Sequence, residues 1–304
     1  MKATVKGQLH PRNPHRFAYD FPALIKVCPD LGPYIHPGRN SQPGIDFSDP
    51  IAVKTLNRAL LMAFYGIVWW DIPPASLCPP VPGRADMIHY LADLLAGKPG
   101  SAIPKGPAIR VLDIGVGANC IYPIIGHRSY GWHFVASDIN RASLEAAGKI
   151  RERNPLLREG LELRYQPNPI DVFRGIIREG EFYDLTICNP PFHASAGMAQ
   201  ESNQKRLNKM GLVAKPEAAL NFGGQDTELW CPGGELAFLK QMITQSADFK
   251  RQVTWFTSLV SKKENLVMLY KALRQVKVSD LRTIPMAQGQ KISRFIAWTY
   301  QKPV

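Results

Sequence analysis

Cysteine is scarce in this chain of 304 residues, and its few copies stand alone. There is no Cys-x-x-Cys pair and no cluster of cysteine with histidine, so the sequence supports neither a zinc site nor a disulfide framework. We therefore expect no metal. Free thiols are typical of a reducing compartment, which predicts a cytoplasmic protein. The five cysteines are at positions 28, 78, 120, 188 and 231.

Long apolar runs are also missing. The longest, residues 59–70, has twelve residues and is too short to cross a bilayer. The N-terminus is polar and contains proline, and it lacks the apolar stretch of a secretory signal peptide. No internal repeat is evident. These absences predict a protein that does not span a membrane, and we expect a monomer with one α/β domain and an extension.

Acidic side chains are outnumbered by basic ones, 25 to 37, which gives a formal net charge of +12. The excess is concentrated at the two ends. Residues 201–304 hold 16 basic and 8 acidic side chains, and residues 1–19 hold four basic ones and no acid. Such a balance favours a polyanionic partner, either nucleic acid or an anionic membrane. The alternative is a surface whose charge only keeps the protein soluble.

The first 47 residues have little hydrophobic periodicity. Residues 1–47 are rich in proline, glycine, histidine and basic residues. This composition predicts a basic, flexible arm that is extended or ordered only by a partner.

Residues 48–104 carry helical patterns and predict a mostly helical extension. Asp49-Pro50 resembles an N-cap followed by a first-turn proline, and the helix that it begins should end at Gly66. A second helix is expected over residues 84–96, followed by a glycine at its C′ position.

From residue 105 to residue 304 the pattern changes to an alternation of strands and helices, which is typical of a wound parallel sheet. The last two expected strands form a hairpin through residues 285–290. A seven-stranded, mostly parallel sheet with an antiparallel C-terminal strand is typical of the class I Rossmann-like methyltransferases, whereas dehydrogenase sheets usually stay parallel. The expected strands are 109–114, 132–137, 161–165, 183–188, 252–258, 277–284 and 293–300.

A glycine turn follows the first of these strands. Gly115 and Gly117 let a backbone approach a ligand that a Cβ would exclude. Asp138 ends the next strand, near the distance at which an acid reaches a nucleotide ribose. The dehydrogenase fingerprint needs a further glycine where this chain has Cys120, which disfavours NAD.

Two acids beside this turn have alternative interpretations. Asp138 is either the ribose-binding acid or an N-cap for the helix that begins at Asn140. Asp113 lies within the apolar strand, so we expect it to orient the loop or the sulfonium end of a cofactor and not to do chemistry.

The most informative motif is Asn189-Pro190-Pro191-Phe192, directly after the expected strand 183–188. Proline has no N–H and a fixed φ, so the motif forms a stiff cup lined with acceptors. The Asn189 side-chain oxygen and the Pro190 carbonyl can both accept from one planar amino group, while Phe192 can stack on the ring that carries it. Such a cup suits an exocyclic amine such as N6 of adenine.

Three further polar residues are weaker candidates. Asn168 and Asp171 follow the third strand, where loops line the cofactor crevice, and each is either an adenine contact or a turn residue. Arg84 lies near a helix N-terminus, where a cation opposes the helix dipole, so a cofactor carboxylate is one explanation and a surface arginine is the other.

A long polar segment, residues 193–234, directly follows the cup. A connection of this length inside a compact domain is usually functional or disordered. We expect it to fold over the substrate, and the alternative is a tolerated surface insertion. Its basic residues include Lys205, Arg206, Lys209 and Lys215.

With these motifs the chain resembles the amino-methyltransferases that carry an (Asn/Asp/Ser)-Pro-Pro-(Tyr/Phe) motif. Among them it is most similar to the bacterial adenine-N6 methyltransferases of large-subunit (23S) ribosomal RNA, whose relatives include eukaryotic RNA adenine methyltransferases. The resemblance covers nearly the whole chain except residues 193–232. The matching motifs are residues 46–50, 81–84, 112–115, 189–192, 233–236 and 261–263.

The resemblance implies S-adenosyl-L-methionine as the cofactor and ribosomal RNA as the partner. It carries over Arg84, Gly115, Asp138 and the four residues of the Asn-Pro-Pro-Phe motif as site residues. The motif ends in Phe where Tyr is more common, which removes a hydroxyl and keeps a stacking face. The alternatives are methylation of a protein glutamine, methylation of adenine in DNA, and a non-catalytic RNA-binding factor in ribosome assembly.

Overall fold

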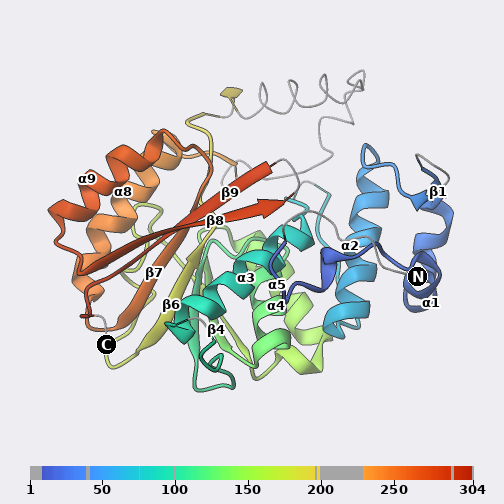
Figure 1. The fold of residues 1–304 in the computed structure, drawn as a ribbon, viewed down its shortest axis with the longest axis horizontal. Coiled ribbons are helices and arrows are strands. Elements are labelled where there is room, and N and C mark those ends of the chain that lie inside the picture. The colour runs from blue at the N-terminus through green and yellow to red at the C-terminus, as the bar shows by residue number, and fades with distance from the viewer. Residues whose placement is uncertain are drawn as a thin grey trace.

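The computed structural model describes residues 9–38, 42–74, 76–98, 100–195, 197–198, 229–288 and 291–302, without the side chains of residues 287, 288, 291 and 292. Its centre is a seven-stranded sheet in the order β5-β4-β3-β6-β7-β9-β8 (Figure 1). β9 runs antiparallel to both of its neighbours, and the other pairs are parallel. The strands are β3 (Arg110–Ile114), β4 (His133–Asp138), β5 (Leu161–Tyr165), β6 (Tyr183–Cys188), β7 (Val253–Val260), β8 (Asp280–Gln288) and β9 (Lys291–Thr299).

The sequence-based prediction of a class I Rossmann-like α/β fold is therefore confirmed. Each predicted strand is present, with ends displaced by a few residues. The predicted hairpin of the last two strands is also present as the antiparallel pair β8–β9.

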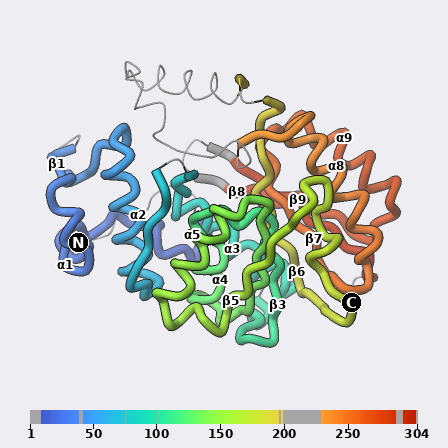
Figure 2. The backbone as a smooth tube through the Cα atoms, turned by 180° about the vertical axis from the view of Figure 1, so that it is seen from behind, coloured from blue at the N-terminus to red at the C-terminus, as the bar shows by residue number. Residues whose placement is uncertain are grey.

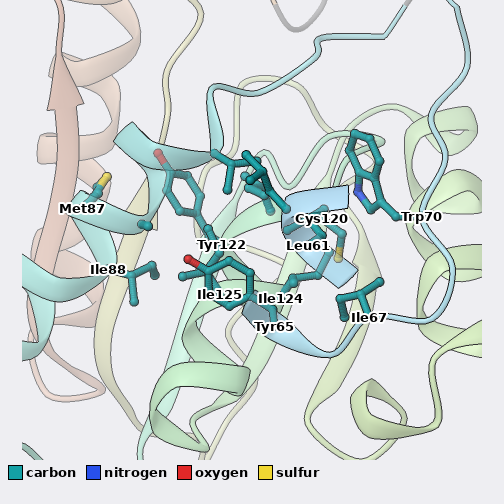
Figure 3. Close-up of a cluster of buried hydrophobic side chains, with 14 of the residues drawn as sticks. Leu61, Tyr65, Ile67, Trp70, Met87, Ile88, Cys120, Tyr122, Ile124 and Ile125 are labelled. Carbon is teal, nitrogen blue, oxygen red and sulfur yellow. The ribbon is translucent and has the colours of Figure 1, made fainter. Parts of the chain in front are cut away.

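The central strands β3, β4 and β6 are buried on both faces, which is why they are nearly continuous apolar runs in the sequence. Successive residues of β3 show this: Val111 packs into one hydrophobic core and Leu112 into the other. Figure 3 shows part of the first core, where side chains of α2, α3 and α4 meet. The larger helices are α2 (Pro50–Tyr65), α3 (Val81–Ala96), α4 (Ile121–Tyr130), α5 (Arg141–Arg153), α8 (Gly234–Ser246) and α9 (Asn265–Gln275).

The two predicted N-terminal helices are present. Asp49 caps α2 by accepting from the N–H groups of Ile51 and Ala52, and Gly66 ends it with φ 64°. α3 begins three residues earlier than predicted, at Val81, because the Pro82-Gly83 pair that resembles a break lies in the first helical turn, where proline is tolerated. Helices α1 (Phe21–Val27) and α2 lie at the opposite end of the molecule from α8 and α9 (Figures 1 and 2).

The structure differs from the predicted flexible arm. Over residues 9–38 the chain folds into short helical turns, whose later part packs on α2 while the first residues bond to α3. The backbone N–H of His10 and the side chain of Asn13 both donate to Asp86, at 2.9 and 2.6 Å. His10 and Asn13 are buried. Hydrogen bonds to a distant side chain order the first residues of this segment, and such bonds leave no hydrophobic periodicity in the sequence. Buried apolar side chains anchor the rest of it in the core. Residues 1–8 of the predicted arm lie outside the described chain.

His89 of α3 is a buried imidazole in this contact. Its Nδ1 shares a 2.7 Å hydrogen bond with the Tyr130 hydroxyl, and its ring stacks on His10 with centroids 5.5 Å apart. Burial lowers the pKa of His89 to about 3, with a smaller contribution from the nearby His10 and Arg12. The ordinary pKa of histidine is about 6.5. Between pH 6.5 and pH 3 the unfolded chain therefore binds a proton at His89 that the folded chain does not.

We expect the free energy of unfolding to decrease as pH falls through this window. One unmatched proton contributes a slope of about 1.4 kcal/mol per pH unit. Urea unfolding at pH 7, 6, 5 and 4 measures that slope. His89→Gln has no titrating ring at this position, so its free energy of unfolding should fall less steeply with pH, by about 1.4 kcal/mol per pH unit. An unchanged slope in the variant would show that His89 does not bind the proton on unfolding.

No helix among the described residues is long and apolar enough to cross a membrane. Over the same residues, no group of three or more His, Cys, Asp or Glu side chains is placed to hold a metal ion.

Candidate active site

A cavity of about 310 Å³ opens at the carboxyl ends of β3, β4 and β6. This is within the volume range of small-molecule sites, and its position where β3 pairs with strands on both sides is the usual crevice of a doubly wound sheet. The glycine turn forms one wall, and Asn189 and Pro191 form another. Trp230, from the far end of the long polar segment, also lines it.

Strand register explains why these residues meet. Ile114 pairs with Cys188 on one side and with Ser137 on the other. The next residue along the chain is Gly115, Asn189 or Asp138, so all three lie side by side at the carboxyl edge of the sheet. Three motifs that are far apart in sequence thereby reach one cavity.

The glycine turn and Asp138 are bonded to each other. Gly115 and Gly117 have φ values of 75° and 62°, in the left-handed region that favours glycine. The N–H of Gly117 donates to Asp138 Oδ2 at 2.8 Å, and the N–H of Asn140 donates to Asp138 Oδ1 at 2.8 Å. A carboxylate oxygen can accept more than one hydrogen bond, so both oxygens retain capacity toward the cavity.

The N-cap alternative for Asp138 is wrong. The cap of α5 is Asn140, whose side chain accepts from the N–H groups of Ala142 and Ser143. Asp138 lines the cavity instead. Burial raises the pKa of Asp138, while the N–H groups of Asn140 and Gly117 act in the opposite direction.

Asp113 lies on β3 behind the turn and is not among the residues that line the cavity. It is buried, and neither carboxylate oxygen has a hydrogen-bond partner among the described residues. Burial raises the pKa of Asp113 to about 8, and the neighbouring Asp138 adds to the rise. The protein interior therefore favours the protonated form of this carboxyl.

Asn189 is held by an arginine from another part of the chain. Arg84 Nη1, from the first turn of α3, donates to Asn189 Oδ1 at 3.1 Å and to the Tyr122 hydroxyl at 2.8 Å. The arginine carbon also lies 5.4 Å from the centre of the Tyr122 ring. This contact fixes Oδ1 as the atom that faces Arg84, and one lone pair of Oδ1 remains for a second donor.

The rest of the motif is placed around this contact. Pro191 lines the cavity, whereas Pro190 and Phe192 are not among the lining residues. Pro190 is buried and Phe192 is half-buried. The N–H groups of Phe192 and His193 both donate to the carbonyl of Leu229, at 3.1 and 3.0 Å.

The weaker candidates separate in the structure. Asp171 lines the cavity, but Asn168 is exposed and is not among the lining residues. The Asn168 side chain accepts from the N–H of Ile170 and donates to Asp171, which is the behaviour of a turn residue. Gln166 was missed by the sequence reading. It directly follows β5 and lines the cavity, which its position after a strand could have indicated.

Tyr122 and Trp230 were also missed as lining residues, and neither carries a local motif that points to the cavity. The two ends of the 193–234 segment meet at the site, because the N–H of Cys231 donates to the carbonyl of His193 at 3.1 Å. Residues 199–228, with the four basic residues Lys205, Arg206, Lys209 and Lys215, lie outside the described chain.

Comparison with known proteins relates this cavity to one family. A family model described as RNA methyltransferase matches residues 3–302. The chain belongs to this RNA methyltransferase family. Membership confirms the predicted resemblance and the predicted enzyme class, a methyltransferase.

Individual relatives agree with the family match. The chain is 53% identical over 301 residues to "Ribosomal RNA large subunit methyltransferase F" of Yersinia pseudotuberculosis serotype O:1b (strain IP 31758), covering 98% of this chain and 89% of the relative. The catalytic domain of human METTL16 in complex with the MAT2A 3′UTR hairpin 1 has a TM-score of 0.80 and 30% identity, with 96% of each chain covered. The N-terminal domain of human METTL16 in complex with SAH has a TM-score of 0.75 and 28% identity, covering 97% of this chain and 99% of that one.

Proposed function

We propose that the protein transfers the methyl group of S-adenosyl-L-methionine to N6 of an adenine in large-subunit ribosomal RNA. One observation carries the proposal: Asn189 lines the same cavity as the Gly115–Gly117 turn and Asp138. An amine acceptor and a nucleoside site within one cavity are the arrangement that group transfer between them requires.

The residues at the glycine end fit an adenosyl group. Asp138 would accept from the ribose hydroxyls, because its two oxygens keep lone pairs after their bonds to Gly117 and Asn140. Gln166 and Asp171 line the region beyond it and would contact the adenine of the cofactor. Arg84 would bind the cofactor carboxylate. When bound, the cofactor supplies an electrophilic methyl group on a sulfonium sulfur.

The residues at the amine end orient the nucleophile. Adenine N6 is a weak nucleophile because its lone pair is delocalised into the ring. Asn189 Oδ1 and the Pro190 carbonyl would accept from the two N–H bonds and favour a pyramidal nitrogen. Both acceptors interact more strongly as positive charge develops on N6, so they stabilise the transition state more than the ground state. No strong base is required, because the proton can leave after the transfer.

The target base must leave its stack to reach the cup. A single-stranded or loop adenine meets this condition most easily, and Phe192 would stack on it. Ribosomal RNA as the substrate is supported by the name of the relatives at 53% identity and by the excess of basic over acidic residues. The free thiols and the location of this RNA in bacteria support a cytoplasmic protein.

A transfer assay tests the substrate class. The protein is incubated with methyl-labelled S-adenosyl-L-methionine and, in separate reactions, unmodified large-subunit ribosomal RNA transcribed in vitro, DNA of the same sequence, and total ribosomal protein. We expect label only in the RNA, released as N6-methyladenosine after nuclease digestion. Label in a protein glutamine or in the DNA would contradict the proposal, and so would the absence of label from all three.

A further inference from the structure

The turn after β7 presents two lysines at the same edge of the sheet as the cup. β7 runs parallel to β6, so its carboxyl end, Val260, lies at the edge where Asn189 follows β6. The next residues are Ser261, Lys262 and Lys263, all exposed. Neither lysine forms an ion pair with any described residue, and the acid nearest in sequence is the exposed Glu264.

A buried carboxylate fixes the backbone of this turn. Glu235, in the first turn of α8, is 2% exposed. It accepts from the N–H of Ser261 at 2.6 Å and from the N–H of Lys262 at 3.3 Å. The Asn265 side chain also donates to it, at 2.6 Å. A buried carboxylate is costly without such partners, so the turn is held in one conformation.

The same helix end packs against the residues after the motif. Gly234 has φ 65°, and a Cβ there would lie 3.2 Å from the backbone nitrogen of Ala194 and 3.3 Å from the carbonyl carbon of His193. The positive charge of Lys262 also contributes to a lowered pKa of His193, after the larger effect of burial. The chain of contacts from the motif through Gly234 and Glu235 to Lys262 is therefore continuous.

Arg294 adds a third cation at this point. Its Nη1 donates to the carbonyls of Val260 and Ser261, at 3.4 and 3.3 Å. The cations at the end of β7 therefore come from two strands of the sheet. A fixed backbone that carries exposed, unpaired ammonium groups is suited to phosphate, which lysine binds as a point charge.

We propose that Lys262 and Lys263 form a phosphate-binding ledge that holds the RNA backbone next to the adenine in the cup. The inference rests on the proposed function and names the substrate groups that this edge contacts. The ledge would fix the RNA backbone on one side of the target nucleotide, so that the target adenine, and not a neighbouring base, enters the cup.

Neutralising both lysines tests the ledge. Lys262→Gln/Lys263→Gln should bind unmodified large-subunit ribosomal RNA about tenfold more weakly at 0.1 M salt. The slope of log K against log salt should become shallower by about 1.4, since each phosphate contact of a single strand contributes about 0.7. The KM for RNA should rise, with kcat and the affinity for S-adenosyl-L-methionine little changed.

Lys250→Gln/Arg251→Gln is the matched control. It removes the same charge from two exposed cations that precede β7, at the opposite edge of the sheet. This variant should keep the wild-type affinity and salt slope. Wild-type affinity and slope in the ledge variant, or equal losses in the two variants, would overturn the ledge. If the wild-type protein itself neither binds nor methylates the RNA, the proposed function fails instead.

Discussion

Replacement of Asn189 by alanine is expected to slow methyl transfer to RNA by about 10²–10³-fold, which is the usual cost of removing one preorganised group that stabilises a transition state. The side chain supplies one of the two acceptors for the amine, and no other described side chain of the motif replaces its oxygen. Arg84 loses one partner but keeps the Tyr122 hydroxyl, so the cofactor end of the cavity should stay intact.

Single-turnover transfer rates and calorimetric titration with S-adenosyl-L-methionine separate the two effects. In Asn189→Ala the rate should fall while the dissociation constant of the cofactor changes by less than about threefold. Asn189→Asp, which keeps an acceptor oxygen, should recover part of the rate. A near-normal rate in the alanine variant would remove Asn189 from the mechanism. If the affinity for S-adenosyl-L-methionine fell as much as the rate, Asn189 would act in cofactor binding.

The second large effect is expected at Asp138. Its carboxylate holds the N–H groups of Gly117 and Asn140 and is the proposed acceptor for the ribose. A hydrogen bond to a charged group contributes about 1.5–3 kcal/mol, so Asp138→Ala should weaken binding of S-adenosyl-L-methionine by about tenfold to a hundredfold. Calorimetric titration measures the change.

An exposed acid provides the matched control for this variant. Asp30 is exposed and pairs with Arg58 away from the cavity, and Asp30→Ala should bind the cofactor as the wild type does. Urea unfolding establishes that Asp138→Ala is folded under the titration conditions. Wild-type affinity in a folded Asp138→Ala protein would show that the ribose is held elsewhere.

The parts of the fold that follow from hydrophobic pattern could be predicted from the sequence. Strands such as β6 are apolar runs bounded by turn residues, and the length and ends of α2 follow from Asp49 and Gly66. The same holds for site residues that come directly after strands, because parallel strands deliver their carboxyl ends to one edge. Gly115 and Asn189 belong to this class, and so does Asp138, the last residue of its strand.

The other parts of the fold and the site depend on contacts between distant residues, which no local sequence pattern indicates. His10 and Asn13 are ordered by Asp86, more than seventy positions away, and an isolated polar segment gives no sign of such partners. The contact that Arg84 makes could not be predicted for the same reason. Its helix position indicated that something must hold it, but the contact with Asn189 spans 105 positions.

The two ends of the 193–234 segment are joined by hydrogen bonds next to the Asn-Pro-Pro-Phe motif. Because Leu229 and Cys231 are bonded to Phe192 and His193, the cup is anchored at the base of this insertion. Length and composition between those anchor points can therefore change over evolution without displacing the chemical centre. Relatives can therefore differ in this stretch and still keep the same chemical centre.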